Sequence, residues 1–576
     1  MSRVKLHRQW LRLLLVAGCA LFPGFAAMAG TVSGTVTGPG GIPIPGATVI
    51  IENIFKGGRT DASGQFSIPD VPPGEHSVSI GSMMLTDQHV TVSVPASGAA
   101  TELAIQLEPN HEMQRAAAAY TPPVPAHLAQ KRDYLAGLAP AGDAERPNIV
   151  VILFDDLGFG DLTSYGNRLI DTPQIDQWGD AGMRLESFYS ASPVCTPSRA
   201  GLLTGRYPTR SHAANHVFFP QQHFMAMIRA ASGFANALPR DEIMIPEMLQ
   251  RAGYATGAFG KWHLGDAPGH RPNDFGFDRY YGVLYSNDMQ PLDMWSDTEI
   301  AIPAGDNRQE DLTRHIADAA IDFIRAHKDR RFFAYIPFTA PHLPIVPADD
   351  YRGISDGGTY GDVIEDLDRN VGRIRDALAQ LDLDDNTLVI ITSDNGANWG
   401  GSAGALRGRK SETFDGGQRV PAFAIWPGHI APGSSSDAMA MNIDLLPTFA
   451  ALAGLELPTD RLIDGRDMAP ILWGDGNSPH DFLYYVTSLS GEYQAVRDAR
   501  FKFRDVIAQK SPLNPVGAVE FYDAIPSLYD LSQDNEAHDV TARHPKERER
   551  LEGQLEKWRA EIAANPRGWR DPSPQE

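Results

Sequence analysis

Two pairs of oxygen-bearing side chains stand directly behind apolar segments of this 576-residue chain. Asp155 and Asp156 follow one such segment, and Asp394 and Asn395 follow another. Carboxylate and amide oxygens are the ligands that Ca²⁺ and Mg²⁺ prefer, whereas zinc favours His and Cys. Two adjacent buried carboxylates also repel each other unless a cation lies between them. Each pair alone could be a helix cap or a turn. Together they predict a site for Ca²⁺, with Mg²⁺ as the alternative.

The apolar segments before these residues are typical of buried strands. Four of them occur, at 148–154, 254–260, 332–338 and 387–393. Lys261 and His263 follow the second segment, and His342 follows the third. Ligands of open α/β sheets bind beyond the carboxyl ends of the strands. We therefore expect all four strands to deliver their polar residues to one edge of a sheet.

The first 29 residues have the layout of a secretory signal peptide. Four basic residues and no acid come first, then an apolar run at 13–22, then the small-residue motif Ala27-Met28-Ala29. We expect cleavage after Ala29 and a periplasmic or secreted protein. The run Val16–Cys19 resembles a lipobox, which leaves lipidation of Cys19 as an alternative. No later segment offers the roughly 18 apolar residues of a transmembrane helix, so we expect no membrane span.

The chain is acidic, with a formal net charge of −22 that becomes −26 once the four basic residues of the leader are removed. Such a surface disfavours nucleic acid as a partner and argues against a broad face for polyanions. An anionic substrate therefore requires a small local cluster of cationic groups.

Only two cysteines occur, and loss of the leader leaves Cys195 alone, which excludes an internal disulfide. A lone cysteine in an exported protein is either reactive or a buried apolar residue, and composition does not decide between them. A phosphatase thiolate loop places its arginine further along the chain than Arg199. A papain-like thiolate is also a poor partner for a hard-oxygen cation site. The residues favour an oxygen nucleophile made at position 195.

The chain is expected to hold four parts after the leader. Short alternating strands at 30–108 predict an all-β sandwich, and the Ala- and Pro-rich segment 109–146 predicts a loosely packed linker. Strands alternating with amphipathic helices at 147–480 predict an α/β catalytic domain. Residues 481–576 form a smaller C-terminal subdomain.

The segment Cys195–Gly205, "CTPSRAGLLTG", resembles the signature of the formylglycine-dependent sulfatases, the arylsulfatase family within the alkaline-phosphatase superfamily. "DDLGFGDLTSYG", "GKWHLG", "APHLP", "TSDNG" and "GRKSETFDGGQRVP" match as well, and "YSNDM" at 285–289 looks like the branch of arylsulfatase A and N-acetylgalactosamine-6-sulfatase. The resemblance implies a mixed-sheet, alkaline-phosphatase-like domain from about residue 147 with a small C-terminal α+β subdomain. Residues 30–108 resemble the carboxypeptidase-regulatory-like, transthyretin-like module.

In that family a maturation enzyme that reads C-x-P-x-R oxidises the cysteine to Cα-formylglycine. The resemblance implies the same change at Cys195 and the following ligands for a Ca²⁺ ion: Asp155, Asp156, Cys195, Asp394 and Asn395. It also implies five further catalytic residues: Arg199, Lys261, His263, His342 and Lys410.

The resemblance assigns a role to each of these five residues. One oxygen of the hydrated aldehyde attacks sulfur, and His263 takes the proton of the other so that sulfate can leave. Lys410 and His342 hold the sulfate and protonate the leaving oxygen. Lys261 binds the sulfate and the modified residue, which Arg199 stabilises. The chain departs from the family pattern at Arg409 and Ser411, which flank Lys410 where relatives commonly have glycine.

The resemblance implies a sulfuric ester hydrolase that acts on a sulfate monoester, either a small molecule or a sulfated glycan. The alternative is a hydrolase of phosphonate monoesters or phosphodiesters that uses the same residues. A non-catalytic surface protein is a third possibility, but the complete set of site residues argues against it. No feature of the sequence indicates an oligomeric state.

Overall fold

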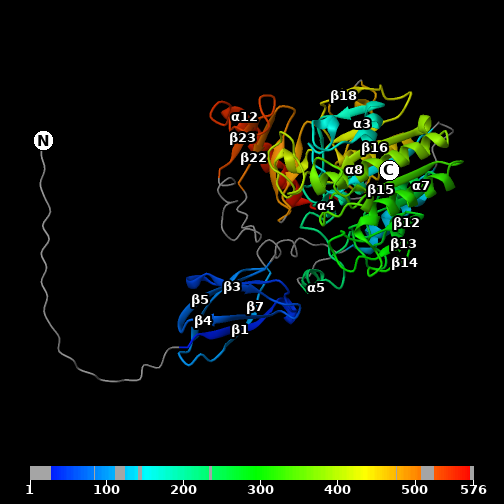
Figure 1. The fold of residues 1–576 in the computed structure, drawn as a ribbon. Coiled ribbons are helices and arrows are strands. Elements are labelled where there is room, and N and C mark those ends of the chain that lie inside the picture. The colour runs from blue at the N-terminus through cyan, green and yellow to red at the C-terminus, as the bar shows by residue number, and fades with distance from the viewer. Residues whose placement is uncertain are drawn as a thin grey trace, which may run out of the picture. The chain divides into compact units, whose positions relative to one another are not determined.

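The structure is a computed structural model. It describes residues 28–82, 85–109, 123–139, 146–231, 236–474, 476–488, 490–506 and 525–570. Residues 1–27 of the expected signal peptide, Cys19 among them, lie outside the described residues. The chain divides into two compact units, one that contains the N-terminal strands and one that contains nearly all the rest (Figure 1). Each unit is described by itself.

The N-terminal unit is an all-β module of two sheets, in which the β1–β4 pair and the whole four-stranded sheet are antiparallel. Its strands are β1 Gly30–Thr37, β2 Thr48–Ile51, β3 Lys56–Arg59, β4 Gln65–Val71, β5 Gly74–Gly81, β6 Gln88–Val94 and β7 Thr101–Gln106. The sheet orders are β4-β1-β7 and β3-β2-β5-β6. Alternation along β5 buries His76, Val78 and Ile80 and leaves the residues between them more exposed. The expected sandwich of short strands is confirmed.

The second unit is built around a ten-stranded mixed sheet of order β14-β13-β12-β11-β15-β8-β16-β17-β9-β18. In that order, the strands are Glu299–Ile302, Met294–Ser296, Arg279–Gly282, Ala255–Phe259, Phe332–Pro337, Asn148–Phe154, Thr387–Ser393, Ala422–Ile425, Met183–Leu185 and Ser434–Ser436. A short parallel pair, β10 Phe188–Tyr189 and β19 Ala440–Met441, lies apart from it.

The four strands expected from the apolar segments are neighbours at the centre of this sheet. β11, β15, β8 and β16 pair in parallel, so their carboxyl ends lie at one edge. All seven residues of β8 are buried, as an apolar run in the middle of a covered parallel sheet should be. The expected delivery of polar residues to a single edge therefore follows from the pairing.

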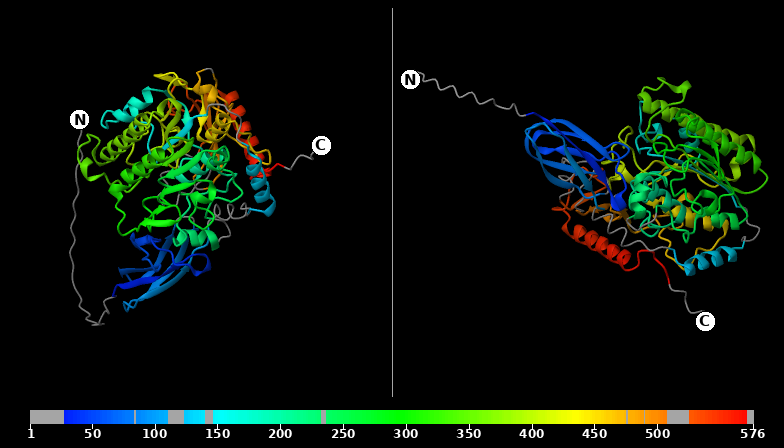
Figure 2. Two further views of the ribbon diagram at one scale, coloured as in Figure 1. Left: turned by 90° about the vertical axis from the view of Figure 1, so that its right-hand side faces the viewer. Right: turned by 90° about the horizontal axis from the view of Figure 1, so that it is seen from below.

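Helices cover both faces of the sheet. The helices of this unit are α2 Pro125–Gly137, α3 Pro173–Asp180, α4 Cys195–Thr204, α5 Phe224–Ala231, α6 Ile245–Arg251, α7 Leu312–Ala326, α8 Gly358–Gln380, α9 Asp415–Gln418, α10 Leu445–Ala453, α11 Ala469–Leu472 and α12 Pro545–Ala564. One buried cluster joins the sheet to α3, α7 and α8, and another joins it to α4, α6 and α10. Figure 2 shows α7 and α8 as neighbouring green helices on one side of the sheet.

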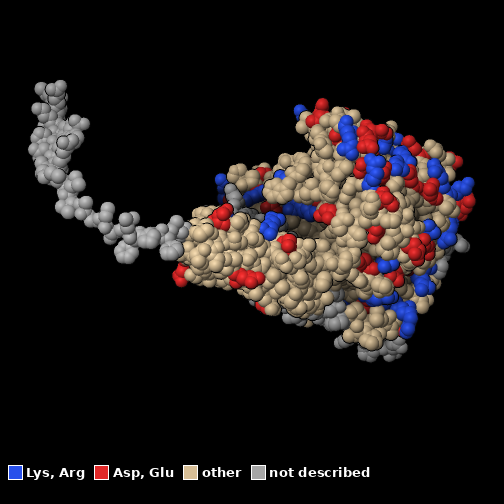
Figure 3. Space-filling model, turned by 60° about the horizontal axis from the view of Figure 1, so that its bottom comes forward, with Lys and Arg blue, Asp and Glu red and all other residues tan. Residues whose placement is uncertain are grey.

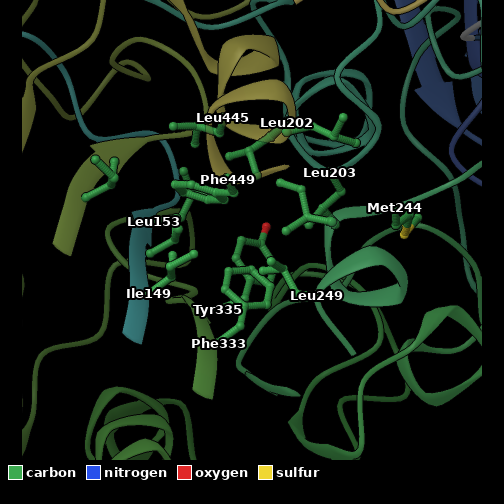
Figure 4. Close-up of a cluster of buried hydrophobic side chains, with 14 of the residues drawn as sticks. Ile149, Leu153, Leu202, Leu203, Met244, Leu249, Phe333, Tyr335, Leu445 and Phe449 are labelled. Carbon is green, nitrogen blue, oxygen red and sulfur yellow. The ribbon is translucent and has the colours of Figure 1, made fainter. Parts of the chain in front are cut away.

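Alternate residues of β8 supply the two apolar clusters. Ile149 and Leu153 lie in the cluster with Leu202 and Leu203 of α4 and with Phe449 of α10 (Figure 4). Because these side chains of β8, α4 and α10 are apolar and buried, they hold α4 firmly against the sheet. This packing places the first residue of α4 beside the carboxyl end of β8.

The last part of the chain forms a four-stranded antiparallel sheet, here called the C-terminal sheet. Its strands are β20 Leu483–Val486, β21 Tyr493–Arg497, β22 Phe501–Arg504 and β23 Ser527–Asp530. Helix α12 packs on it through Leu551, Leu555 and Trp558. The expected small α+β subdomain is confirmed in class.

The segment expected to be a loosely packed linker, 109–146, holds a docked helix. Within its described part, α2 buries Lys131 and Leu135. The Lys131 ammonium group lies 2.7 Å from Glu247 Oε1 and donates to the carbonyl of Glu242 at 2.6 Å. The Ala and Pro content of the segment suggested a linker. The sequence could not show the docking, because the residues that Lys131 contacts lie more than a hundred positions further along the chain.

The exposed face drawn in Figure 3 carries Lys and Arg side chains interspersed with Asp and Glu. Among the described residues, no helix has the length and apolar character needed to cross a bilayer.

A buried cluster of three charged side chains joins the loop after α4 to the segment that follows α12. The loop residue Arg206 donates to both oxygens of Glu242 at 2.9 and 2.7 Å, and Arg567 Nη2 donates to Glu242 Oε1 at 2.9 Å. All three side chains are almost fully buried. Burial would raise the pKa of Glu242, but Arg206 and Arg567 outweigh it and lower the pKa to about 2.

We expect Glu242→Gln to lower the free energy of unfolding by about 3 kcal/mol at neutral pH, because two buried guanidinium groups lose a counter-charge. A depressed carboxyl pKa stabilises the fold above the unfolded value of 4.5, and the contribution is lost as the pH falls towards about 2. Urea-induced unfolding at neutral and at acidic pH measures both effects. The exposed Glu549→Gln is the control, and an equal loss in the two variants would contradict the prediction.

Candidate active site

The carboxyl ends of β8 and β16 bring the two oxygen-bearing pairs together. The two strands are paired in register up to their last residues. The backbone N–H of Asp156 donates to Asp394 Oδ1 at 3.1 Å, and Asn395 Nδ2 donates to Asp156 Oδ1 at 2.8 Å. With Asp155, these side chains are at most 1% exposed. The four predicted ligand residues therefore form one buried cluster.

Cys195 is the first residue of α4 and lies against the same carboxylates. Its thiol donates to Asp155 Oδ1 at 3.3 Å, and Lys410 Nζ donates to Sγ at 3.6 Å. Pro197 fits the first turn of α4, where a backbone N–H would have no helical partner. Burial and the charge of Asp155 raise the pKa of Cys195 well above its ordinary value. The environment thus disfavours the thiolate form of Cys195, which a papain-like or a phosphatase site would require.

Arg199 lies one turn further along α4 and is fully buried. Its Nε and Nη2 both reach Asp394 Oδ2 at 2.8 Å, and its Nη1 donates to the carbonyl of Lys261 at 2.8 Å. This paired geometry fixes the Asp394 carboxylate while its other oxygen accepts the Asp156 N–H. Burial and Asp155 nevertheless raise the pKa of Asp394 to about 7.

Lys261 follows β11 and points into the cluster. Its ammonium group donates to Asp155 Oδ2 at 2.6 Å and to Ser286 Oγ at 3.0 Å. Ser286 Oγ also lies 3.3 Å from His342 Nδ1. Burial would raise the pKa of Asp155, but Lys261, His342 and Arg199 hold it well below its ordinary value. The described structure therefore has Asp155 as a carboxylate.

His342 and Lys410 approach the cluster from the side of Asp156. His342 Nδ1 lies 2.7 Å from the carbonyl of Leu343, which assigns the ring proton to Nδ1. Its Nε2 then carries a lone pair 3.6 Å from Asp156 Oδ2. Lys410 Nζ donates to the same oxygen at 2.7 Å. Burial opposes the charge of Lys410, but Asp156 outweighs it and raises the pKa of Lys410, which stays an ammonium ion.

His263 joins the cluster through α4, since Thr196 Oγ1 donates to its carbonyl at 2.9 Å. Its Nε2 lies 3.1 Å from the carbonyl of Phe218 and so carries the proton, whereas its buried Nδ1 has no hydrogen-bond partner in the described structure. Burial, Lys261 and Arg199 hold the pKa of His263 well below its ordinary value. The ring is neutral and offers a lone pair, as a proton acceptor requires.

Two loop residues that the sequence did not predict complete the cluster. Ser286 bridges Lys261 and His342, and Asn398 Nδ2 donates to Asp156 Oδ2 at 3.1 Å. Ser286 lies within the motif "YSNDM", and Asn398 lies three residues after Asn395. The only signals in the sequence were that Ser286 lies inside one motif and that Asn398 closely follows another.

The donor set fits a divalent cation. Ligand atoms of Asp155, Asp156, Cys195 and His342 lie within 4.8 Å of one another. Asn395 Oδ1 is buried without a hydrogen-bond partner in the described part of the chain, which is costly unless a cation takes it. His342, expected to act on the sulfate, thus lies within reach of the cation ligands. Most of the donors are hard oxygens, as Ca²⁺ and Mg²⁺ prefer.

The backbone is strained where these side chains converge. Asp156 has a φ of 69°, His263 of 62° and Ser411 of 76°, all in the left-handed region that non-glycine residues rarely adopt. Such strain persists only where surrounding contacts fix it, and it is common at functional sites.

The C-terminal sheet holds the loop that carries Lys410. Arg407 Nη1 donates to the carbonyl of Glu536 at 3.0 Å, and Thr413 Oγ1 donates to Gln494 Oε1 at 2.6 Å. Arg504 Nε donates to Thr413 Oγ1 at 2.9 Å. These bonds flank Lys410 on both sides, so the subdomain determines where its ammonium group lies.

A buried cation fixes the end of the same loop. Lys502 of β22 lies 2.8 Å from both Asp415 Oδ1 and Glu536 Oε1, and 3.8 Å from the centre of the Tyr485 ring. Burial would raise the pKa of Asp415, but Lys502 and Arg497 outweigh it and lower the pKa. Two buried carboxylates therefore depend on this one ammonium group.

We expect Lys502→Met to lower the free energy of unfolding by about 3–5 kcal/mol, because it removes the ammonium group that the buried carboxylates of Asp415 and Glu536 share. The Lys410 loop should also become more susceptible to trypsin at Arg407, Arg409 or Lys410. Denaturant titration and timed digestion followed by mass spectrometry measure the two effects. The control is Arg500→Met at the residue before β22, which removes a pair between a half-exposed arginine and Asp530 and should cost no more than about 1 kcal/mol. Equal behaviour of the two variants would show that Lys502 does not hold the loop.

Comparison with known proteins agrees with this geometry. Residues 147–455 match the family described as Sulfatase, more than half of the chain. The chain belongs to the sulfatase family. Residues 31–108 match the carboxypeptidase regulatory-like domain, and residues 409–561 match the C-terminal part of N-sulphoglucosamine sulphohydrolase. The protein is therefore a sulfuric ester hydrolase of the arylsulfatase type.

Named relatives extend the similarity along most of the catalytic unit. The sulfatase is 39% identical to N-acetylgalactosamine-6-sulfatase of Rattus norvegicus over 62% of its own length and 73% of the relative. It is 37% identical to arylsulfatase A of Bos taurus over 69% of its own length and 83% of the relative. A crystal structure of Ps i-CgsB in complex with k-i-k-neocarrahexaose shares 29% identity, with a TM-score of 0.64 over 74% of this chain and 95% of that one.

Proposed function

We propose that this sulfatase carries Cα-formylglycine at position 195, made from Cys195 by a maturation enzyme, and that it hydrolyses sulfate monoesters beside a bound Ca²⁺ ion, with Mg²⁺ as the alternative. The observation that carries the proposal is the surrounding of Cys195. Its Sγ contacts two carboxylates and one ammonium group, and burial with Asp155 raises the pKa of the thiol. A thiol kept protonated is a poor nucleophile.

The hydrated aldehyde would supply two hydroxyl groups at one carbon, one to attack sulfur and one whose deprotonation releases sulfate. The cation would lower the pKa of an oxygen bound to it and orient the sulfate group. Asp155, Asp156, Asn395 and Asp394 are the residues that would hold the cation together with position 195.

The chain's own side chains supply the remaining steps. Lys261 and Lys410 lie on different carboxylates next to position 195, so their ammonium groups can bind the sulfate oxygens from two sides. His263 holds a free lone pair at Nδ1 and serves as the proton acceptor. Lys410 and His342, both at Asp156, serve to hold the sulfate and to protonate the leaving oxygen. For His342 this requires a second ring proton on Nε2, the nitrogen that faces Asp156, because the first lies on Nδ1. Arg199 holds Asp394 and the backbone of Lys261 in place.

The substrate that we propose is a sulfated glycan. The named similarity to an N-acetylgalactosamine-6-sulfatase and to a structure with a bound neocarrahexaose supports this class. We further propose that the protein is exported, periplasmic or secreted, after cleavage behind Ala29. The layout of residues 1–29 supports this proposal.

We expect the tryptic peptide Leu185–Arg199 to carry an aldehyde in place of the Cys195 thiol when the protein is made with a maturation enzyme. Mass spectrometry of the digest measures the loss of sulfur and two hydrogens and the gain of one oxygen that turn the thiol into the aldehyde, and it also reads the mature N-terminus, expected at Gly30. Cys195→Ala should reduce turnover of 4-nitrophenyl sulfate about 10⁴-fold, since the nucleophile is lost.

Full turnover by protein with an unmodified thiol would contradict this mechanism. An unchanged melting temperature in Cys195→Ala is the control that separates lost chemistry from lost folding. A phenylphosphonate monoester, assayed in parallel, tests the alternative substrate class, and turnover above that of the sulfate would favour the alternative.

We expect chelation of the cation to lower the melting temperature and Ca²⁺ to restore it, because a ligand that binds only the folded state stabilises that state. Asn395→Leu should remove most of this Ca²⁺-dependent rise, since Asn395 Oδ1 has no other partner in the described structure. Differential scanning fluorimetry with Ca²⁺ and with Mg²⁺ measures the effect without relying on activity. Exposed Asn386→Leu is the matched control, and a full rise in Asn395→Leu would exclude that residue as a ligand.

A further inference from the structure

Trp399 stands exposed beside the catalytic cluster. Its side chain is 82% exposed, although an indole ring is among the largest apolar surfaces in a protein. Its neighbour Asn398 donates from Nδ2 to Asp156 Oδ2 at 3.1 Å and accepts the Trp399 backbone N–H at Oδ1 at 2.7 Å. The loop is therefore tied to the cluster at the residue before the indole.

Arg409 covers one side of the indole. Its guanidinium carbon lies 4.7 Å from the ring centre, and its Nη1 donates to the carbonyl of Asn398 at 3.5 Å. The next residue is Lys410, whose ammonium group contacts Asp156 and Cys195. Both members of the Trp399–Arg409 pair, here called the rim pair, are thus one residue away from side chains of the catalytic cluster.

The rim pair differs from the other exposed apolar residues. Single exposed apolar side chains are common and need no explanation. Phe55 is more exposed than Trp399 but belongs to the N-terminal module. Among the described residues no carboxylate forms an ion pair with the Arg409 guanidinium group, in a chain whose net charge is −22, although Glu412 Oε2 accepts the Arg409 backbone N–H at 2.9 Å. An open aromatic face beside a guanidinium group without an ion pair, both next to residues of the cluster, is a feature of ligand recognition.

We propose that the rim pair is a binding subsite for the sugar unit next to the one that carries the scissile sulfate. The open face of Trp399 receives the apolar C–H face of a pyranose ring, and Arg409 binds a sulfate or carboxylate group of the same unit. This inference rests on the proposed function, because it places the scissile sulfate at position 195. The substrate is then an anionic oligosaccharide rather than an isolated aryl or steryl sulfate.

The shape and charge of the rim pair favour a glycan over a steroid. A rigid apolar steroid gains most from an enclosed apolar pocket, whereas the Trp399 face is open to solvent. A sugar ring offers apolar C–H groups on one face and hydroxyl groups at its edge, so it can stack while its edge stays hydrated. The guanidinium group suits planar, paired contacts with a sulfate or carboxylate.

The test is inhibition of 4-nitrophenyl sulfate turnover by two sulfated hexasaccharides, one from chondroitin 6-sulfate and one from ι-carrageenan. We expect at least one of them to inhibit the mature enzyme competitively. Trp399→Ala should raise its inhibition constant about 5- to 10-fold, with Trp399→Phe intermediate because a smaller ring remains. Arg409→Gln should raise the constant and weaken its dependence on salt. Each variant's own kinetic constants for 4-nitrophenyl sulfate are measured first.

Trp473→Ala is the matched control, since this indole is 38% exposed and packs against Trp426, which lies outside the catalytic cluster. If neither hexasaccharide inhibits the wild type, or if the constants of the Trp399 and Trp473 variants agree, the subsite is wrong. If the mature wild type does not hydrolyse 4-nitrophenyl sulfate or release sulfate from either hexasaccharide, the proposed function itself fails. The two failures are therefore distinct.

Discussion

The structure of the site depends on the repulsion between Asp155 and Asp156, two buried carboxylates in adjacent positions. Charges removed from water are tolerated only with counter-charges close by. Lys261 and Arg199 face the first carboxylate, and Lys410 faces the second. Every one of these cations comes from a different element, so the repulsion at the end of β8 requires β11, α4 and the Lys410 loop to meet there. This arrangement of charged side chains is thus an electrostatic requirement of the fold.

The same requirement extends into the C-terminal sheet. Lys410 can neutralise Asp156 only if its loop is fixed, and the loop is fixed by bonds to Gln494, Arg504 and Glu536. Lys502 in turn neutralises the carboxylates that anchor the loop end. Two buried charge clusters are therefore linked through the Lys410 loop. One lies around Asp155 and Asp156 at the edge of the sheet, and the other lies around Lys502. The second lies outside the reacting centre and still determines the position of a residue within it.

The sequence predicted the parts of the site that depend on strands and on contiguous motifs. The runs before Asp155, Lys261 and Asp394 are apolar because central parallel strands are covered on both faces, and parallel pairing then places their ends together. Ser286 and Asn398 could not be predicted in this way, because their positions depend on loop conformations set by distant partners. The docking of α2 was missed for the same reason. Lys131 of α2 contacts Glu242 and Glu247, which lie more than a hundred residues further along the chain.

The net charge of the chain supports the proposal that the site holds a cation in addition to its lysines and arginine. Asp155, Asp156 and Asp394 offset Lys261, Lys410 and Arg199, which leaves the cluster close to neutral before a substrate arrives. An anionic ester approaching an acidic protein then gains little from the fixed charges alone. A divalent cation at the Asn395 oxygen would add two positive charges and would stabilise Asp394 as a carboxylate, against the rise of its pKa to about 7. The proposed ion would therefore both reduce the repulsion that remains between the carboxylates and make the site attractive to sulfate.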